Sequence, residues 1–391
     1  MITRLTKLFD EFFESEKAGG IVLIVCTIVS LTIANTGAGT SYIAFWHVEL
    51  AGLSIEHWIN EALMAIFFLL IGLELKRELL IGELSNLKDA LLPVFGAIGG
   101  MLIPAGIYIL MNQGTPSQPG AGIPMATDIA FAIGVLSLLG SRVPLSLKVL
   151  LTAIAVIDDL GAIIVIAIFY TANLSLLNLG IVLALFAVLL LLNKFKIKWL
   201  PLYLLGGIFM WYFMLKSGIH ATLAGILLAF AIPFGKGEEK SLSYKMQHWL
   251  HKPVSFIILP LFALANTAII FESNWHSGLS SPGSLGIFTG LIIGKPGGII
   301  LLSFLAISLG ICTLPGDIRW KHVLGIGFLA GIGFTMSIFI TLLAYDDNAL
   351  ITQAKIAILF ASLISGLFGF IWLRLSLKKS PIANLETDYR S

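Results

Sequence analysis

The chain has 391 residues, of which 58% are hydrophobic and only 12% are charged, and its formal net charge is +2. Soluble domains carry about 25% charged residues, so this composition argues against a soluble enzyme. The near-neutral charge and the mean hydropathy of +0.97 argue equally against nucleic-acid binding and disorder, which leaves a polytopic membrane protein.

Apolar runs separated by polar breaks predict about twelve membrane spans in an all-α protein, since a span needs about 20 mostly apolar residues. The runs cover residues 12–34, 57–80, 90–112, 121–140, 146–170, 175–193, 200–215, 218–234, 254–271, 284–309, 322–344 and 352–375. Acidic residues among the first 20 argue against a cleaved signal peptide. We expect one integral membrane domain over residues 1–391, embedded from about 12 to 375, with a cytoplasmic tail at 376–391.

The lysines and arginines predict the orientation, because span ends that face the cytoplasm are enriched in them. All but three of the 24 lie at one set of span ends. Lys216 and Lys355 lie at the other set, and Lys295 lies inside a span. An even number of spans preserves this asymmetry, so both termini are expected in the cytoplasm.

The two longest polar connections between the expected spans cover residues 35–56 and 235–253. The connection at 35–56 contains no lysine or arginine, so it is expected outside the cell. Its sequence from Ser41 to Leu53 predicts a small hairpin. The connection at 235–253 is basic and is expected to be a cytoplasmic loop.

Spans three to five and spans ten to twelve share a pattern, in which a glycine-rich segment lies between two long helices. The two groups begin on opposite sides of the membrane, so they would form an inverted repeat. The interrupting residues are Gly122, Pro124 and Gly134 in the fourth span and Gly325, Gly327, Gly331 and Gly333 in the eleventh. Interrupted segments at matching positions indicate a binding site near the middle of the membrane. The alternative is that these glycines only allow helices to pack closely.

Asp158 and Asp159 lie about 18 Å along the fifth span, near its centre. Charges at this depth are costly and usually functional. Adjacent residues differ by about 100° around a helix, so one carboxylate can line a cavity while the other meets a protein partner. Two carboxylates this close repel one another when both are charged, so protons and cations compete for them. A purely structural pair is the less favoured alternative.

Asp128 and Lys295 are the other charges placed inside spans. Asp128 follows Thr127 in the interrupted fourth span, where a hydroxyl and freed carbonyls supply the oxygen ligands that hard cations prefer. It can equally offset the partial positive charge of a half-helix end. A buried lysine either pairs with a carboxylate or loses its proton, and Asp158 and Asp128 are the partners available to Lys295. Three formal negative charges and one positive charge favour a cation in this site.

A second acidic group lies on span two. Glu74 and Glu78 are neighbours one turn apart, with Arg77 between them, at the cytoplasmic end. They can form a funnel that gathers cations and responds to pH, or they can be an ordinary solvated helix end. Glu61 lies deeper in the sequence of this span and is expected to be functional or paired.

Two histidines are candidates for a pH response, because the ordinary pKa of histidine is near 6.5. His220 begins span eight, and His248 lies with His251 on the basic connection. A lone histidine at an interface is more often structural, and loop histidines are more often merely solvated.

Six motifs in this order resemble the NhaA-type sodium/proton antiporters, over about residues 10–375. They are Phe67–Glu74 (FFLLIGLE), Ala126–Ala132 (ATDIAFA), Ile157–Gly161 (IDDLG), Ser217–Thr222 (SGIHAT), Gly294–Pro296 (GKP) and Gly331–Ser337 (GIGFTMS). The resemblance implies twelve helices with an inverted repeat and two broken, crossing helices, spans four and eleven.

The resemblance also implies roles for the residues inside the spans. Asp159 would be the principal Na⁺ or Li⁺ ligand. Asp158 would exchange protons beside it and pair with Lys295. Asp128 and Lys295 would balance the facing half-helix ends, with Thr127 nearby.

The family exchanges internal Na⁺ or Li⁺ for more than one external proton, is regulated by pH from the cytoplasmic face, and serves sodium and pH homeostasis and salt tolerance. Its members are bacterial inner-membrane proteins that often dimerise through an outward hairpin. This chain departs from the family at Glu61, where other members carry Asp, and at Gln247, where they carry Glu. The second departure puts the pH threshold in doubt.

Two other functions remain alternatives. An intramembrane aspartyl hydrolase needs two carboxylates that share one water, which Asp128 with Asp158 or Asp159 could supply. Lys295 inside the site and the lack of a Gly-x-Gly-Asp motif argue against it. A cation channel would not need competing protonation. No nucleotide-binding motif is present, so no cofactor, nucleotide or nucleic acid is expected, and the partners are Na⁺, Li⁺, H⁺, the lipid bilayer and a second copy of the chain.

Overall fold

The structure is a computed structural model that describes residues 2–171, 174–235, 241–271 and 275–377. Among these residues, ten helices are long and apolar enough to cross a membrane, and a pair bent by 48° at its break adds an eleventh. The only strands described are two of two residues each, so the expectation of an all-α polytopic protein is confirmed. The expected tail beyond residue 377 lies outside the described residues.

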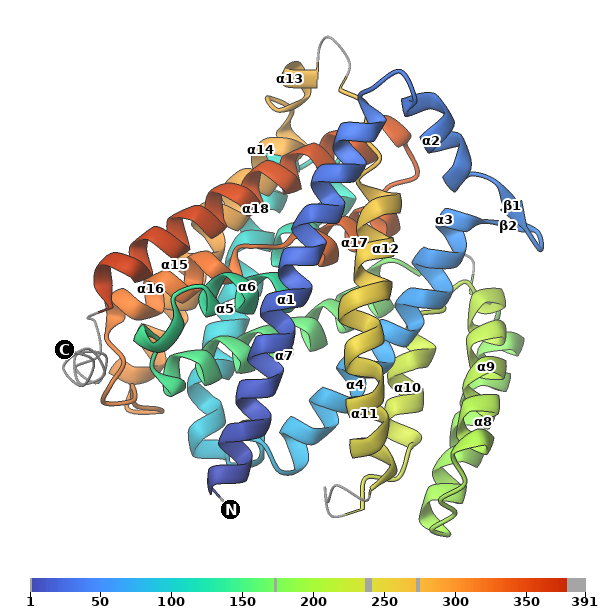
Figure 1. Cartoon of the computed structure of the whole chain (residues 1–391), viewed down its shortest axis with the longest axis horizontal. Coiled ribbons are helices and arrows are strands. Elements are labelled where there is room, and N and C mark those ends of the chain that lie inside the picture. The colour runs from blue at the N-terminus through green and yellow to red at the C-terminus, as the bar shows by residue number, and fades with distance from the viewer. Residues whose placement is uncertain (1, 172–173, 236–240, 272–274, 378–391) are drawn as a thin grey trace, which may run out of the picture.

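The first part of the chain ends with the helix that carries the paired aspartates (Figure 1). Its elements are α1 (Ile2–Ala34), α2 (Gly39–Trp46), β1 (Glu49–Leu50), β2 (Leu53–Ser54), α3 (Ile55–Trp58), the π-helix η1 (Ile59–Leu63), α4 (Met64–Leu80), the 3-10 helix η2 (Glu83–Ser85), α5 (Leu87–Asn112), the 3-10 helix η3 (Gln118–Met125), α6 (Ile129–Ser137), the 3-10 helix η4 (Gly140–Arg142) and α7 (Leu145–Phe169).

The second part begins with α8 and α9, which stand at one edge of the molecule in Figure 1. Its elements are α8 (Leu176–Lys194), α9 (Leu200–Ser217), α10 (Leu223–Ala231), α11 (Leu242–Pro253), the π-helix η5 (Val254–Ile258), α12 (Leu259–Asn266), α13 (Trp275–Gly278), α14 (Pro282–Thr289), the π-helix η6 (Gly290–Gly294), α15 (Lys295–Ser308), α16 (Trp320–Ala330), α17 (Phe334–Ala344) and α18 (Asn348–Ser376).

The expected eighth span, 218–234, contains a shorter helix than its hydropathy suggests. Only α10, nine residues long, is helical within it, after a turn at the left-handed Gly218 (φ +84°). This short helix is held by α4, where the buried Lys76 donates hydrogen bonds to the carbonyls of Phe230 (2.8 Å) and Ile232 (2.6 Å). A cation at the C-terminal end of a helix satisfies its last carbonyls and offsets their partial negative charge.

The expected cytoplasmic loop at 235–253 is largely helical. Ser241 accepts a hydrogen bond from the Tyr244 amide and so starts α11, which continues through η5 and α12 as one span over Leu242–Asn266. The prediction of a loop was wrong at this point because the first turns of the span are polar and basic, which conceals the start of a membrane helix from a hydropathy reading.

The hairpin expected from Ser41 to Leu53 is only partly present, because its first half is helical. Residues from Gly39 to Trp46 form α2, and only Glu49–Leu50 and Leu53–Ser54 pair as antiparallel strands. The turn between them uses a positive φ at Ala51 and Gly52.

Both predicted breaks are present. The fourth span consists of η3 and α6, joined by extended backbone at Ala126–Asp128, and the eleventh consists of α16 and α17, joined at residues 331–333. Their order along the chain matches the expected repeat, with α5 and α7 around the first break and α15 and α18 around the second. The corresponding helices α5 and α15 touch through their backbones, since a Cβ on Gly99 would lie 2.0 Å from the Gly298 carbonyl oxygen and one on Gly298 would lie 2.1 Å from that of Gly99.

Candidate functional site

The paired aspartates lie side by side in the middle of α7, a 25-residue helix made almost entirely of apolar residues. Each is 1% exposed. Because consecutive side chains leave a helix in different directions, the two carboxylates meet different surroundings.

Asp158 is enclosed by donors. The Lys295 ammonium lies 2.8 Å from its Oδ2, and both side chains are fully buried. The Thr127 hydroxyl lies 2.7 Å from the same oxygen. Of the two partners that the sequence offered to Lys295, the structure therefore places Asp158 against it. A buried ion pair of this kind is stable only when further hydrogen bonds satisfy its atoms, which Thr127 does here.

Asp159 is in the opposite situation. Neither of its carboxylate oxygens has a hydrogen-bond partner among the described residues, although both are buried. Asp158, Asp128 and Glu74 are the carboxylates that act on it electrostatically, and Lys295 is the cation that does so. A buried carboxylate without donors is costly as an anion, so it must bind a proton or a cation.

Asp128 joins the positive ends of two half-helices. It is the N-cap of α6, where its Oδ1 accepts from the Phe131 amide at 3.0 Å. Its Oδ2 accepts from the Thr335 amide at 3.0 Å, in the first turn of α17, and also from the Thr335 hydroxyl. One carboxylate thus satisfies amides at both N-termini and offsets their partial positive charge.

The negative ends of the half-helices meet donors from the same group of residues. Lys295 donates to the Met125 carbonyl at the end of η3. The Thr127 hydroxyl lies 2.9 Å from the Ala330 carbonyl at the end of α16, and its single hydrogen can serve either this oxygen or Asp158. The backbones also meet directly, because the Asp128 amide donates to the Ile332 carbonyl at 2.7 Å. The two breaks therefore form one structure around Asp158.

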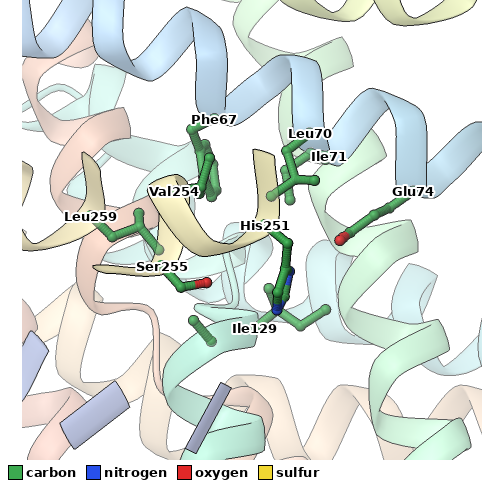
Figure 2. Close-up of a pocket in the computed structure, with 10 residues that line it drawn as sticks. Phe67, Leu70, Ile71, Glu74, Ile129, His251, Val254, Ser255 and Leu259 are labelled. Atoms are coloured by element: carbon green, nitrogen blue, oxygen red, sulfur yellow. The ribbon is translucent and has the colours of Figure 1, made fainter. Parts of the chain in front are cut away.

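A pocket lies beside this centre, toward the membrane side that carries most lysines and arginines, here called the basic side. Apolar residues of α4, α6, η5 and α12 line most of it. Figure 2 shows Glu74 of α4 and His251 of α11 in its lining, together with Ile129, the residue after Asp128. The Gln247 side chain hydrogen-bonds the Glu74 carboxylate. Of the residues predicted for the funnel, Glu74 is thus the one that lines this pocket.

The remaining predicted funnel residues are not brought to the aspartates. Arg77 pairs with Glu78 at 2.8 Å between the Nη2 and Oε1 atoms, at the half-exposed end of α4. His248 is exposed on α11 and stacks on Tyr244, with the ring centroids 6.4 Å apart. These residues lie near Glu74 in sequence or on the same helix, but they do not line the pocket.

Glu61 and His220 meet at the opposite end of α4. Their nearest ionisable atoms, Glu61 Oε1 and His220 Nδ1, are 3.9 Å apart. The other histidine nitrogen, Nε2, lies 2.9 Å from the Tyr170 carbonyl oxygen, so Nε2 carries a proton. Sequence reasoning named both residues but did not predict that they form a pair.

Three tyrosine hydroxyls hold η3, the half of the fourth span that leads away from the basic side. The Tyr108 and Tyr345 hydroxyls lie within hydrogen-bond distance of one another, and each lies 2.9 Å from the Ser117 carbonyl oxygen, so their two hydrogens serve two of these three contacts. The Tyr170 hydroxyl donates to the Pro119 carbonyl at 2.8 Å. Burial raises the pKa of Tyr170 to about 12 and also raises that of Tyr345, so both hydroxyls keep their protons. Uncharged hydroxyl groups therefore hold η3 at the end that is farther from the basic side.

Sequence reasoning missed Thr335 and the partner of Glu74. Thr335 lies within the Gly331–Ser337 motif, so its polar side chain beside two glycines was a usable signal. The contact between Gln247 and Glu74 joins helices far apart in the sequence, and no local pattern indicates it.

The comparisons with known proteins agree with one another over nearly the whole chain. The family model for Na+/H+ antiporter 1 matches residues 10–373. The chain is 63% identical to the Na(+)/H(+) antiporter NhaA of Flavobacterium psychrophilum over 381 residues, which are 97% of this chain and 99% of that protein. It is 58% identical to that of Cytophaga hutchinsonii over 98% of this chain and 99% of the relative. It is 47% identical to that of Vibrio cholerae, over 95% and 99%.

Proposed function

Because the chain belongs to the Na+/H+ antiporter 1 family, we propose that it is a secondary transporter that exports Na⁺ or Li⁺ from a bacterial cell in exchange for external protons. The observation that carries the mechanism is the buried Asp159 carboxylate, which has no hydrogen-bond partner among the described residues. Such a group holds either a proton or a cation, and exchange between the two is the reaction of an antiporter.

The ion site centres on Asp159, with Asp158 as its partner. When Na⁺ arrives from the cytoplasm, Asp159 releases its proton and supplies oxygen ligands, which hard cations prefer. Lys295 and Thr127 hold Asp158 beside it. A cation close to Asp158 weakens the attraction between Asp158 and Lys295, so a second proton can leave from this pair. Return of two protons for one Na⁺ would move one net positive charge inward, and the membrane potential would then drive export.

The broken helices supply a site that can be reshaped. Asp128 neutralises the N-termini of α6 and α17, and Lys295 neutralises the C-terminal end of η3. With the helix ends compensated, the Asp159 carboxylate is left to the transported ion. Movement of the half-helices would expose the loaded site alternately to the two sides of the membrane.

The access in this structure supports an inward-facing state. The basic side is the cytoplasmic side by the positive-inside rule, which places both termini in the cytoplasm. The pocket with Glu74 and His251 approaches from there, whereas the tyrosines close the opposite side. The membrane is then the inner membrane of the bacterium.

The groups at the pocket would regulate transport in response to the cytoplasmic pH. Glu74 lines the pocket, and the Arg77–Glu78 ion pair lies on the next turn of α4, while His248 is exposed on α11. Protonation of this group would reduce its attraction for Na⁺, so transport would slow as the cytoplasm becomes acidic. A homodimer joined through the β1–β2 hairpin would leave this pocket accessible.

The test uses everted membrane vesicles from a host without its own sodium/proton antiporters. Respiration acidifies the vesicle interior, and Na⁺, Li⁺ or K⁺ is added at several pH values while a dye reports the internal pH. We expect Na⁺ and Li⁺ to release the acid in wild type and in Asp89→Asn, which changes an exposed aspartate on α5, but not in Asp159→Asn.

The same assay separates the alternatives. A channel would carry Na⁺ without moving protons at zero membrane potential, and an intramembrane hydrolase would give no ion-dependent signal. A normal response in Asp159→Asn would overturn the assignment of the ion site. No response at any pH in wild type, with the protein present in the membrane, would overturn the proposed exchange.

A further inference from the structure

The second break needs partners for backbone groups that the aspartates do not reach. Residues 331–333 interrupt the helix, so amides at the start of α17 and carbonyls at the end of α16 lose their partners along the helix. The N-cap position of α17 is Gly333, which has no side chain to supply one. Asp128 serves the Thr335 amide and Thr127 serves the Ala330 carbonyl. The groups on the other face of the break require another source.

That source is α18, the continuous helix that packs against both halves. The Ser362 hydroxyl oxygen accepts from the Phe334 amide, the first of α17, at 3.1 Å. The Ser365 hydroxyl donates to the Phe328 carbonyl, in the last turn of α16, at 2.8 Å. Both serines are buried. Positions three residues apart lie on one face of a helix, so one turn of α18 contacts both sides of the break.

The backbone packing at this turn leaves little freedom. A Cβ on Gly331 would lie 2.4 Å from the Ser365 hydroxyl oxygen and 2.4 Å from the Leu291 carbonyl oxygen. The break is therefore pressed between α18 and η6. The directions of the two hydrogen bonds also suit the helix ends. Ser362 accepts from an amide at the N-terminus of α17, and Ser365 donates to a carbonyl at the C-terminus of α16.

We propose that Ser362 and Ser365 are positioning residues for ion binding, which hold the two halves of the eleventh span in the geometry that Asp128 and Thr127 require. This inference rests on the proposed function for its transport readout. Ser362 is the more important of the two. Without it, the Phe334 amide is buried without this acceptor, beside the Thr335 amide that bonds Asp128, so its partial positive charge is no longer offset. Uncompensated positive charge at this helix end opposes the entry of a cation. Ser365 matters less, since the Phe328 carbonyl also accepts from the Gly331 amide.

The transport experiment compares the KM for Na⁺ with the maximal rate in everted vesicles. We expect Ser362→Ala to raise the KM about tenfold, with the maximal rate nearly unchanged, because a buried amide loses its partner. Ser365→Ala is expected to raise it about threefold. Ser362→Thr keeps the hydroxyl and should restore most of the affinity. The matched control is Thr341→Val, which removes a buried hydroxyl that donates to the Ser337 carbonyl within α17 and contacts neither break, and its KM should equal that of wild type.

A second measurement does not depend on transport. Hydrogen exchange followed by mass spectrometry on the purified full-length protein should show faster exchange of the Phe334 amide in Ser362→Ala than in wild type and in Thr341→Val. The proposal is overturned if wild type transports Na⁺ but Ser362→Ala keeps its KM, or if the maximal rate falls while the KM does not change. If wild type shows no exchange of Na⁺ for protons, the proposed function fails, and unchanged hydrogen exchange at Phe334 would then overturn the positioning role separately.

Discussion

The two broken spans solve the same problem with different means. The first break contains its own polar residues, Thr127 and Asp128, and Asp128 caps the helix that follows it. The second break, at residues 331–333, contains only glycine and isoleucine, and it takes its partners from the first break and from α18. The one charged residue within the two breaks, Asp128, therefore belongs to the first.

The first break is therefore held mainly by electrostatic interactions, and the second mainly by close packing. Substitutions at the first break, or at its partner Lys295, should act through charge and should disturb both spans. Substitutions at the second break should act through packing, because no charged residue lies between Phe328 and Ser337. Four predictions test this division.

The largest effect is expected from Lys295→Met. This change removes the partner of Asp158 and the donor to Met125 while keeping an apolar stem of similar length. Breaking a buried ion pair costs about 3–5 kcal/mol. The loss should grow as the pH rises, because an unpaired buried carboxylate is tolerated best with a proton on it. Thermal unfolding in detergent at several pH values measures this, and a pH-independent loss would show that packing dominates.

The next effect is expected from Asp128→Asn. The amide oxygen still accepts hydrogen bonds, but the negative charge between the two helix N-termini is lost. Charge-assisted bonds contribute about 1.5–3 kcal/mol, so we expect the KM for Na⁺ to rise about 100-fold or transport to disappear. Initial rates in everted vesicles over a range of Na⁺ concentrations give the answer. A rise of less than threefold would mean that the second break does not depend on this charge.

A smaller and purely steric effect is expected from Gly331→Ala. The new Cβ would lie 2.4 Å from the Leu291 carbonyl oxygen, so backbone must move. Overpacking of this kind costs about 1–3 kcal/mol. The control is Gly297→Ala on α15, where nothing lies within 4 Å of the new Cβ. The unfolding temperature should fall equally at all pH values in the first variant and should not fall in the second. A pH-dependent fall would argue against a steric second break.

The smallest effect is expected from Thr127→Val. The hydroxyl serves Asp158 and Ala330 in turn, and Asp158 keeps Lys295 without it. One hydrogen bond contributes about 1 kcal/mol, which corresponds to about a fivefold rise in the KM for Na⁺. The vesicle assay used for Asp128→Asn measures this as well. An effect as large as that of Asp128→Asn would place Thr127 on the ion itself.

The sequence predicts the charged half of this arrangement better than the steric half. Aspartates and a lysine inside apolar runs are conspicuous, so Asp128, Asp158, Asp159 and Lys295 could be named, and the breaks could be located from Pro124 and the glycines. The position of Lys295 against Asp158 rather than Asp128 depends on how α15 packs, and the sequence left both open. Ser362 and Ser365 are ordinary helical serines until the fold places the break beside them.

Two fold expectations failed for a related reason. The helical start of α11 at Leu242 is polar, and the short α10 is apolar, so hydropathy misplaced both ends of this region. What decides them is local capping by Ser241 and distant capping by Lys76. Hydropathy measures the surroundings that a segment can enter, whereas caps determine where its helix begins and ends.

The contact of Gly99 with Gly298 has a mechanical consequence. Each glycine carbonyl lies where the Cβ of the other would be, so no side chain can stand between α5 and α15 at this point. Side chains that separate two helices can change rotamer and let the helices slide, whereas two backbones in direct contact have nothing to repack. An alanine at either glycine would therefore have to push the two helices apart.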